Sequence, residues 1–277
     1  MERYHPIVNF IYFAIVIGCS MFLMHPVCLA ISTLGAFCYV LHLFGWNNAR
    51  KGLASLLVIM LLTAIMNPAF SHQGITVLTY LPSGNVLTLE SIFFGIASAF
   101  MLASSIMWFR CMSEILTSDK IVYLFGKTFP ILGLVLSMVL GFVPKLQRKF
   151  SEINRCRGNR VIDNLSILIT WALDDAMLVA DSMKGRGYGL EGRTTYTIYR
   201  FTKQDGWKIG LMLLALFYIV LGNINGGLGW NYYPKTEGSG FQLYSISIYL
   251  VYGWICILPV LEDYWKERTW NKLQSNI

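Results

Sequence analysis

Six apolar segments follow one another along the chain, and polar links separate them. They cover residues 7–23, 26–44, 52–67, 88–109, 207–222 and 241–261, with a turn predicted at residues 45–48 between the second and the third. Each segment is close to the ~20 apolar residues with which a helix crosses the hydrocarbon core of a bilayer. The pattern predicts an all-α polytopic membrane protein with about six transmembrane helices.

Between the fourth and the fifth segment the pattern changes to that of two long amphipathic helices, which we expect to cross. Leu146, Phe150 and Ile153 recur at helical spacing and predict a helix with Pro144 in its first turn and Gly158 at its end. The second predicted helix has an apolar face made of Val161, Leu165, Leu168, Ala172, Ala176, Val179 and Met183. A different face carries Asp163, Thr170, Asp174 and Asp181.

Both predicted helices end in an arginine that is followed by a glycine, Arg157-Gly158 and Arg186-Gly187. Glycine suits the conformation that closes a helix, and a basic residue suits the negative end of the helix dipole. One such pair is a common helix stop. Two of them, 29 residues apart on amphipathic helices, predict a pair of exposed contact points for a partner.

The composition agrees with a membrane protein. The chain is 55% hydrophobic and only 13% charged, against roughly 25% charged residues in a soluble domain. The net charge of +7 does not indicate nucleic-acid binding, because the charged residues concentrate in one stretch. Residues 145–208 hold 12 Lys or Arg and seven Asp or Glu by count, a local balance of +5. The six cysteines form no C-x-x-C pair, and we expect them to be small buried hydrophobic residues.

The basic residues predict the topology, since cytoplasmic loops collect Lys and Arg. With six spans and a cytoplasmic N-terminus, 21 of the 22 basic residues lie inside and only Lys235 lies outside. Both termini are then cytoplasmic. The predicted domains are a four-span bundle at 1–110, a cytoplasmic coupling-helix region at 111–206 and two further spans at 207–277.

Residues 121–143 are apolar enough to form another span, but a seventh span would place many basic residues outside. We therefore expect this segment to lie along the inner membrane surface or under a partner, with Ser118-Asp119 capping its start. The proline at position 130 interrupts it.

Few residues have a pattern that indicates catalysis or metal binding. Gly126-Lys127-Thr128 imitates the end of a P-loop, but Ile121 stands where the motif needs glycine. The four histidines lack metal-ligand spacing. Asp174 and Asp175 diverge on a helix, and we expect each to be solvated or paired with an arginine. We expect no catalytic residue, metal site or cofactor in this chain.

Two features of the apolar segments concern transport and packing. None of the six has an ionisable residue in its middle, which disfavours a self-sufficient carrier, because carriers usually place such groups at depth. Gly95, Ala99 and Ala103 form a ridge of small residues that allows close helix approach, either within the bundle or against a partner.

These motifs resemble the transmembrane T component of energy-coupling factor (ECF) transporters, the EcfT/CbiQ family. The resemblance covers most of the chain. It includes the stretches Asn67-Pro68-Ala69-Phe70, Leu116-Thr117 to Asp119, Phe142-Val143-Pro144 and Arg186-Gly187-Tyr188-Gly189 with Arg193-Thr194 and Tyr196. The family motif is Ala-Arg-Gly, twice. Here Cys156-Arg157-Gly158 and Gly185-Arg186-Gly187 stand in its place.

The resemblance implies the coupling subunit of a three-part importer of vitamins or transition metals in a prokaryotic cell membrane. Two ABC-type ATPase subunits would bind ATP and Mg, and each would receive one motif arginine. A separate membrane protein, the S component, would bind the substrate and rest on the apolar face of the second helix. An alternative is a membrane-embedded lipid or phosphate-group transferase that binds phosphates with its basic cytoplasmic region.

Overall fold

The computed structural model describes residues 4–71, 74–80, 86–158, 160–188, 199, 201–238 and 242–274. Helices dominate these residues, and the fold is that of an all-α polytopic membrane protein, which confirms the predicted fold class. The chain divides into two compact units. The bundle unit combines Met1–Leu116 with Phe201–Ile277, and the inserted unit is Thr117–Arg200.

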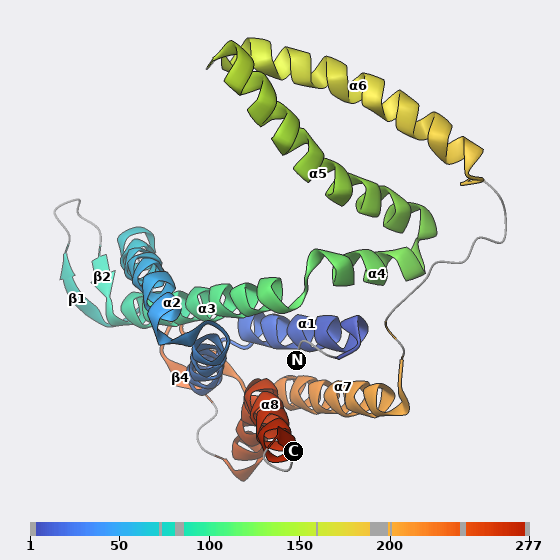
Figure 1. Cartoon of the computed structure of the whole chain (residues 1–277). Coiled ribbons are helices and arrows are strands. Elements are labelled where there is room, and N and C mark those ends of the chain that lie inside the picture. The colour runs from blue at the N-terminus through green and yellow to red at the C-terminus, as the bar shows by residue number, and fades with distance from the viewer. Residues whose placement is uncertain are drawn as a thin grey trace. The chain divides into compact units, whose positions relative to one another are not determined.

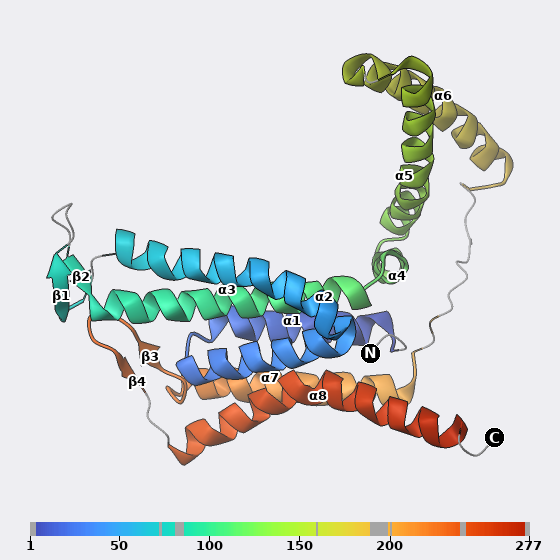
Figure 2. The ribbon, with the colours of Figure 1, turned by 60° about the vertical axis from the view of Figure 1, so that its left-hand side comes forward.

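The bundle unit is built from long helices that pack side by side. They are α1 (Pro6–Phe22), α2 (Pro26–Phe70), α3 (Leu89–Ile115), α7 (Lys203–Ile224) and α8 (Leu243–Gln274). Helix α1 contacts α3 and α7, whereas α2 contacts α3 and α8, and α7 contacts α8 (Figures 1 and 2). His5 and His25 cap the first two helices, because the Nδ1 atom of each imidazole accepts a hydrogen bond from the N–H two residues further on.

Helix α2 contains two of the predicted spans and folds back on itself at Gly45 (Figure 2). This residue has φ 68° and ψ 166°, a conformation that glycine adopts without steric cost. Arg110 lies against the reversal, 4.4 Å from the Phe44 ring centroid. The predicted turn at 45–48 is therefore helical except at its first residue.

Aromatic side chains fill the centre of the bundle. The largest fully buried ones are Tyr12, Phe13, Tyr39, Trp108 and Tyr252. Two of them form hydrogen bonds inside the bundle: Trp108 Nε1 donates to Ser32 Oγ over 3.1 Å, and the Tyr12 hydroxyl donates to the Ile255 carbonyl over 3.2 Å. Such bonds offset the cost of burying a polar group.

The small-residue ridge of α3 lies inside the bundle. Gly95, Ala99 and Ala103 are all buried. A Cβ atom on Gly95 would lie only 2.7 Å from the Ala64 carbonyl oxygen, so the end of α2 approaches α3 closely here. Of the two roles left open by the sequence, the structure shows internal packing.

Two short antiparallel hairpins lie at the end of the bundle where α3 begins (Figure 2). One pairs β1 (Val77–Tyr80) with β2 (Val86–Thr88), and the other pairs β3 (Trp230–Asn231) with β4 (Glu237–Gly238). His25 is buried beside the second hairpin, with its Nε2 atom 3.0 Å from the Tyr249 hydroxyl. His72 lies outside the described residues.

Six helical segments of the described residues are long and apolar enough to cross a membrane. They are Pro26–Arg50, Gly52–Phe70, Leu89–Ile115, Ile131–Arg157, Lys203–Ile224 and Leu243–Trp265. This set differs from the predicted one at two places. Pro6–Phe22 is shorter than a typical span, and Ile131–Arg157 qualifies by length and composition although charge asymmetry predicts that it stays on the cytoplasmic side.

The inserted unit contains α4 (Ser118–Thr128), α5 (Pro130–Arg157) and α6 (Val161–Gly185). Helices α4 and α5 cross closely, since a Cβ atom on Gly133 would lie 2.3 Å from the Gly126 Cα atom. Gly126, Lys127 and Thr128 form the last turn of α4.

Two predictions about helix starts are wrong. Pro144 lies inside α5 and not in its first turn, because Pro130 begins this helix. Either proline could occupy the first turn of a helix, and in the structure Pro130, the earlier one, does so. Helix α4 starts at Ser118, so its N-cap is Thr117 and not the predicted Ser118-Asp119 pair.

Candidate functional site: the two arginine ends of α6

Arg157 is the last residue of α5 and is exposed. Gly158 closes the helix with φ 74° and ψ −173°, and its N–H donates to the Asn154 carbonyl over 3.0 Å. Positive φ with an extended ψ is a region that essentially only glycine occupies. The predicted glycine stop is confirmed at this end.

Arg186 closes α6 in a different way. The arginine itself is the C-cap, and Gly187 follows with φ 73°. The Tyr188 N–H donates to the Met183 carbonyl, and the Gly187 N–H donates to the Lys184 carbonyl, over 3.1 Å and 3.0 Å. This is a Schellman motif. The two helices therefore end with different caps, although both use a glycine at positive φ.

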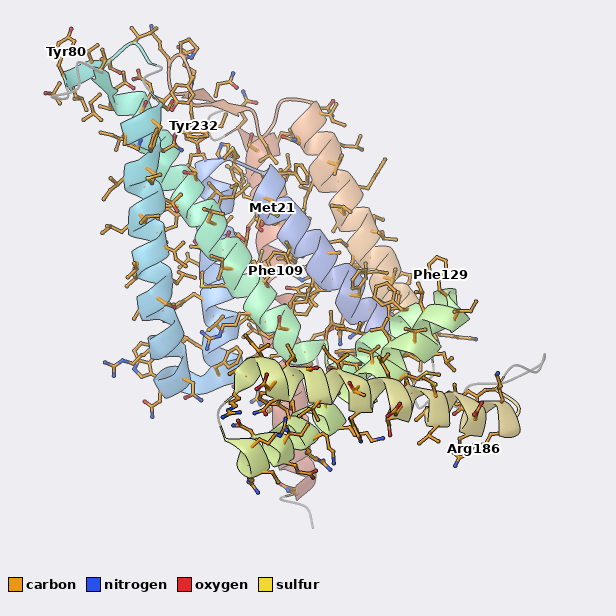
Figure 3. All side chains as sticks on the ribbon, turned by 90° about the horizontal axis from the view of Figure 1, so that it is seen from above. Met21, Tyr80, Phe109, Phe129, Arg186 and Tyr232 are labelled. Carbon is orange, nitrogen blue, oxygen red and sulfur yellow. The ribbon has the colours of Figure 1, made fainter. Side chains whose placement is uncertain are left out.

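The two arginines lie at opposite ends of α6. Arg157 precedes the corner between α5 and α6. Arg186 lies at the far end of α6, as Figure 3 shows. A helix of 25 residues is about 38 Å long at 1.5 Å per residue. The two positive side chains therefore cannot share one small ligand and provide two separate points of contact.

Neither arginine is paired with an acidic group among the described residues of its unit. Within the described part of the chain, no ion pair involves Arg157 or Arg186, and both residues are exposed. More positive charge lies beside each end, from Arg155 and Arg160 at the corner and from Lys184 at the far end. Among the described residues, both ends therefore carry positive charge without an acidic partner, which acidic groups of another molecule could bind.

A cluster of charged and aromatic side chains holds α6 against α5. Lys145 Nζ lies 2.7 Å from both carboxylate oxygens of Asp175. The same ammonium group lies 5.5 Å from the Trp171 ring centroid. The ammonium group of Lys149, one turn further along α5, lies 5.6 Å from the same centroid. Asp174, by contrast, is exposed. The two carboxylates diverge as predicted, but the partner of Asp175 is a lysine and not an arginine.

The predicted apolar face of α6 is only partly covered. Four of its members are exposed, namely Val161, Leu165, Ala176 and Val179, and the other three, Leu168, Ala172 and Met183, are half-buried. The side toward α5 instead carries Trp171 and Asp175, together with the buried Asn164. The four exposed members of the predicted face can thus contact another molecule.

The sequence interpretation missed part of this exposed apolar surface. Further apolar side chains of α6 that are more than half exposed are Ile162, Ile169, Leu173, Met177 and Leu178. A plot of every α6 residue at 3.6 residues per turn would have placed Ile169 and Leu173 beside the predicted stripe. Asn164 and Trp171 were missed because neither type marks a helix–helix contact in a sequence.

The residues before the motif arginines occupy open positions. Cys156 is exposed with a free thiol, as is Cys38, so the expectation of burial is wrong for these two cysteines and right for the other four. Gly185 is helical, and an added Cβ atom would meet no atom within 4 Å. The structure therefore shows no close helix contact at either position. Arg193, Thr194, Tyr196 and Gly189 lie outside the described residues.

Among the described residues, no group of three or more His, Cys, Asp or Glu side chains is placed to hold a metal ion. Comparison of the sequence with protein-family models and with curated proteins finds no match.

Proposed function

We propose that this chain is the transmembrane coupling subunit of an ATP-driven importer of the ECF type, equivalent to the T component. The observation that carries this proposal is the pair of exposed arginines at opposite ends of α6, neither of which has an acidic partner among the described residues. In this function the two ends dock into two ATP-binding subunits.

The chemistry of arginine suits this task. A guanidinium group forms two parallel hydrogen bonds with a carboxylate, so it fixes direction as well as charge. A separation of about 38 Å allows each end to enter a different ATPase subunit. Movement of the two subunits would then turn α6 as a rigid lever.

The exposed apolar surface of the inserted unit fits a membrane-embedded S component. Besides α6, the first half of α5 exposes Ile131, Leu132, Val135, Val139, Leu140 and Val143. Its apolar part, residues 130–143, is about 21 Å long and falls short of the ~30 Å hydrocarbon core. This length favours a position at the membrane surface under a partner.

The partners would supply the chemistry. ATP and Mg would be bound by the two ABC-type ATPase subunits, and the vitamin or transition metal by the S component. The chain itself would be a non-catalytic subunit in a prokaryotic cell membrane, with residues 111–206 and both termini in the cytoplasm.

Co-expression with ABC ATPase subunits from the same organism tests the proposal. We expect a detergent-stable complex with two ATPase subunits for each copy of the chain, and ATP hydrolysis that the chain stimulates. Photo-crosslinkers placed at Cys156 and at Lys184 should each reach an ATPase subunit. A chain that purifies alone, and that transfers a phosphate or lipid group by itself, would support the transferase alternative instead.

A further inference from the structure

Asn164 is the one residue of α6 that is fully buried, although α6 is exposed over most of its described length. Its side-chain Nδ2 group donates two hydrogen bonds, one to the Gly158 carbonyl over 2.9 Å and one to Asn154 Oδ1 over 3.2 Å. Both acceptors belong to the end of α5. The amide therefore ties the first turn of α6 to the last turn of α5.

The bonds converge on the residue that follows Arg157. The Gly158 carbonyl accepts from Asn164 Nδ2 and also from the Arg160 N–H over 2.9 Å, while the Gly158 N–H donates to the Asn154 carbonyl. Gly158 has no side chain of its own to hold it, and it sits in a conformation reserved for glycine. The side chain of Asn164 thus restrains the direction in which Arg157 leaves α5.

This arrangement has a cost that an apolar residue would avoid. The Oδ1 atom of Asn164 is buried and has no hydrogen-bond partner among the described residues. An unpaired buried polar atom destabilises a fold, whereas a leucine of similar size would pack without that cost. The asparagine is better explained by its two directional donors than by stability.

We propose that Asn164 is a positioning residue that sets the orientation of Arg157 and makes the α5–α6 corner move as one body. The inference rests on the proposed docking function. Arg157 enters the ATPase subunit, and Asn164 acts only through it. Arg186, at the other end of α6, is independent of Asn164.

A spin-label measurement on the full-length chain tests the rigid corner without any partner. Nitroxides on Cys156 and on a cysteine at position 184 (Lys184→Cys), in a Cys38→Ser background, report the distance along α6. We expect a narrow distance distribution that Asn164→Ala broadens, whereas the matched control Ser166→Ala on the exposed side leaves it narrow. An equally narrow distribution in Asn164→Ala would overturn the inference.

Docking to the co-expressed ABC ATPase subunits then separates positioning from general stability. Asn164→Ala removes two hydrogen bonds at the corner, and we expect it to weaken docking about tenfold. The same loss should appear in an Arg186→Ala background and vanish in an Arg157→Ala background, since coupled residues are not additive. An equal loss in both backgrounds means a merely structural role and contradicts the inference.

Two further variants keep the outcome decisive. Asn154→Ala removes one acceptor and leaves the bond to Gly158, so it should give a smaller loss that also depends on Arg157. This variant serves if Asn164→Ala does not fold. If Arg157→Ala docks like the unmodified chain, the proposed function itself fails. If Arg157→Ala weakens docking but the Asn164 and Asn154 variants do not, only the positioning role fails.

Discussion

At the scale of single residues, glycines determine where α5 and α6 end. Gly158 and Gly187 have φ near +74° and end their helices, whereas Gly185 is part of a regular helix although it lies only two residues before Gly187. Gly185 and Gly187 both flank Arg186, but Gly185 has a helical backbone and Gly187 has a positive φ. The same substitution should therefore have opposite effects at positions 185 and 187.

Gly185→Ala should stabilise the last turn of α6 by up to about 1 kcal/mol, because alanine is the better helix former and its Cβ atom meets open space. Gly187→Ala should destabilise the same turn by roughly 1–2 kcal/mol, since an L-residue is strained at positive φ. Hydrogen exchange of the amides at 186–188 measures both effects. Slower exchange in Gly187→Ala would contradict the assigned helix end.

At the scale of elements, the sequence predicted the helical segments better than the contacts between them. The apolar periodicity of α6 and the glycine stops are visible in the sequence, because propensity and capping are local properties. The start of α5 was missed, since Pro130 and Pro144 both satisfy the local rule for a first turn. The residues that hold α5 against α6 were also missed, because a buried asparagine has no periodic signature.

The crossing of α4 and α5 provides an element-scale prediction. Gly133→Ala places a methyl group 2.3 Å from the Gly126 Cα atom, so it should force the helices apart and destabilise the crossing by about 1–3 kcal/mol. The control is Gly141→Ala in the same helix, where a Cβ atom meets nothing within 4 Å and a small gain is expected. Limited proteolysis near residue 129 compares the two, and equal cleavage would argue against the close crossing.

At the scale of the whole molecule, charge and length lead to different assignments for α5. Length and composition make Ile131–Arg157 a possible span, whereas the distribution of Lys and Arg keeps it on the cytoplasmic side. We favour the second assignment, because residues 145–157 carry six charged side chains by count. The sequence of α5 alone does not fix its side of the membrane, since the topology depends on the Lys and Arg content of all the loops.

Cysteine labelling in intact cells tests the topology. Ser151→Cys, in a background in which Cys38 and Cys156 are replaced by serine, should resist an impermeant maleimide, because the proposed topology places the exposed residue 151 in the cytoplasm. Lys235→Cys in the same background should react from outside. Reaction at position 151 in intact cells would exclude the six-span arrangement with a cytoplasmic inserted unit.

The central claim is that Arg157 and Arg186 connect this chain mechanically to two ATPase subunits. Removing one member of a buried charge pair commonly costs about 2–5 kcal/mol, and charge reversal adds repulsion. Arg148 is the matched control, an exposed arginine of α5 that lies away from both helix ends. Arg193 and Arg200, which lie outside the described residues, should also matter less.

The most direct measurement is the affinity of the chain for its ABC ATPase subunits in Arg157→Glu, Arg186→Glu, the double variant and Arg148→Glu, with substrate uptake measured in parallel. The account predicts that each single reversal weakens docking by orders of magnitude, that the double variant neither docks nor transports, and that Arg148→Glu does both. If the double variant docks and transports like the unmodified chain, the two Arg-Gly ends are only helix stops and the account is wrong.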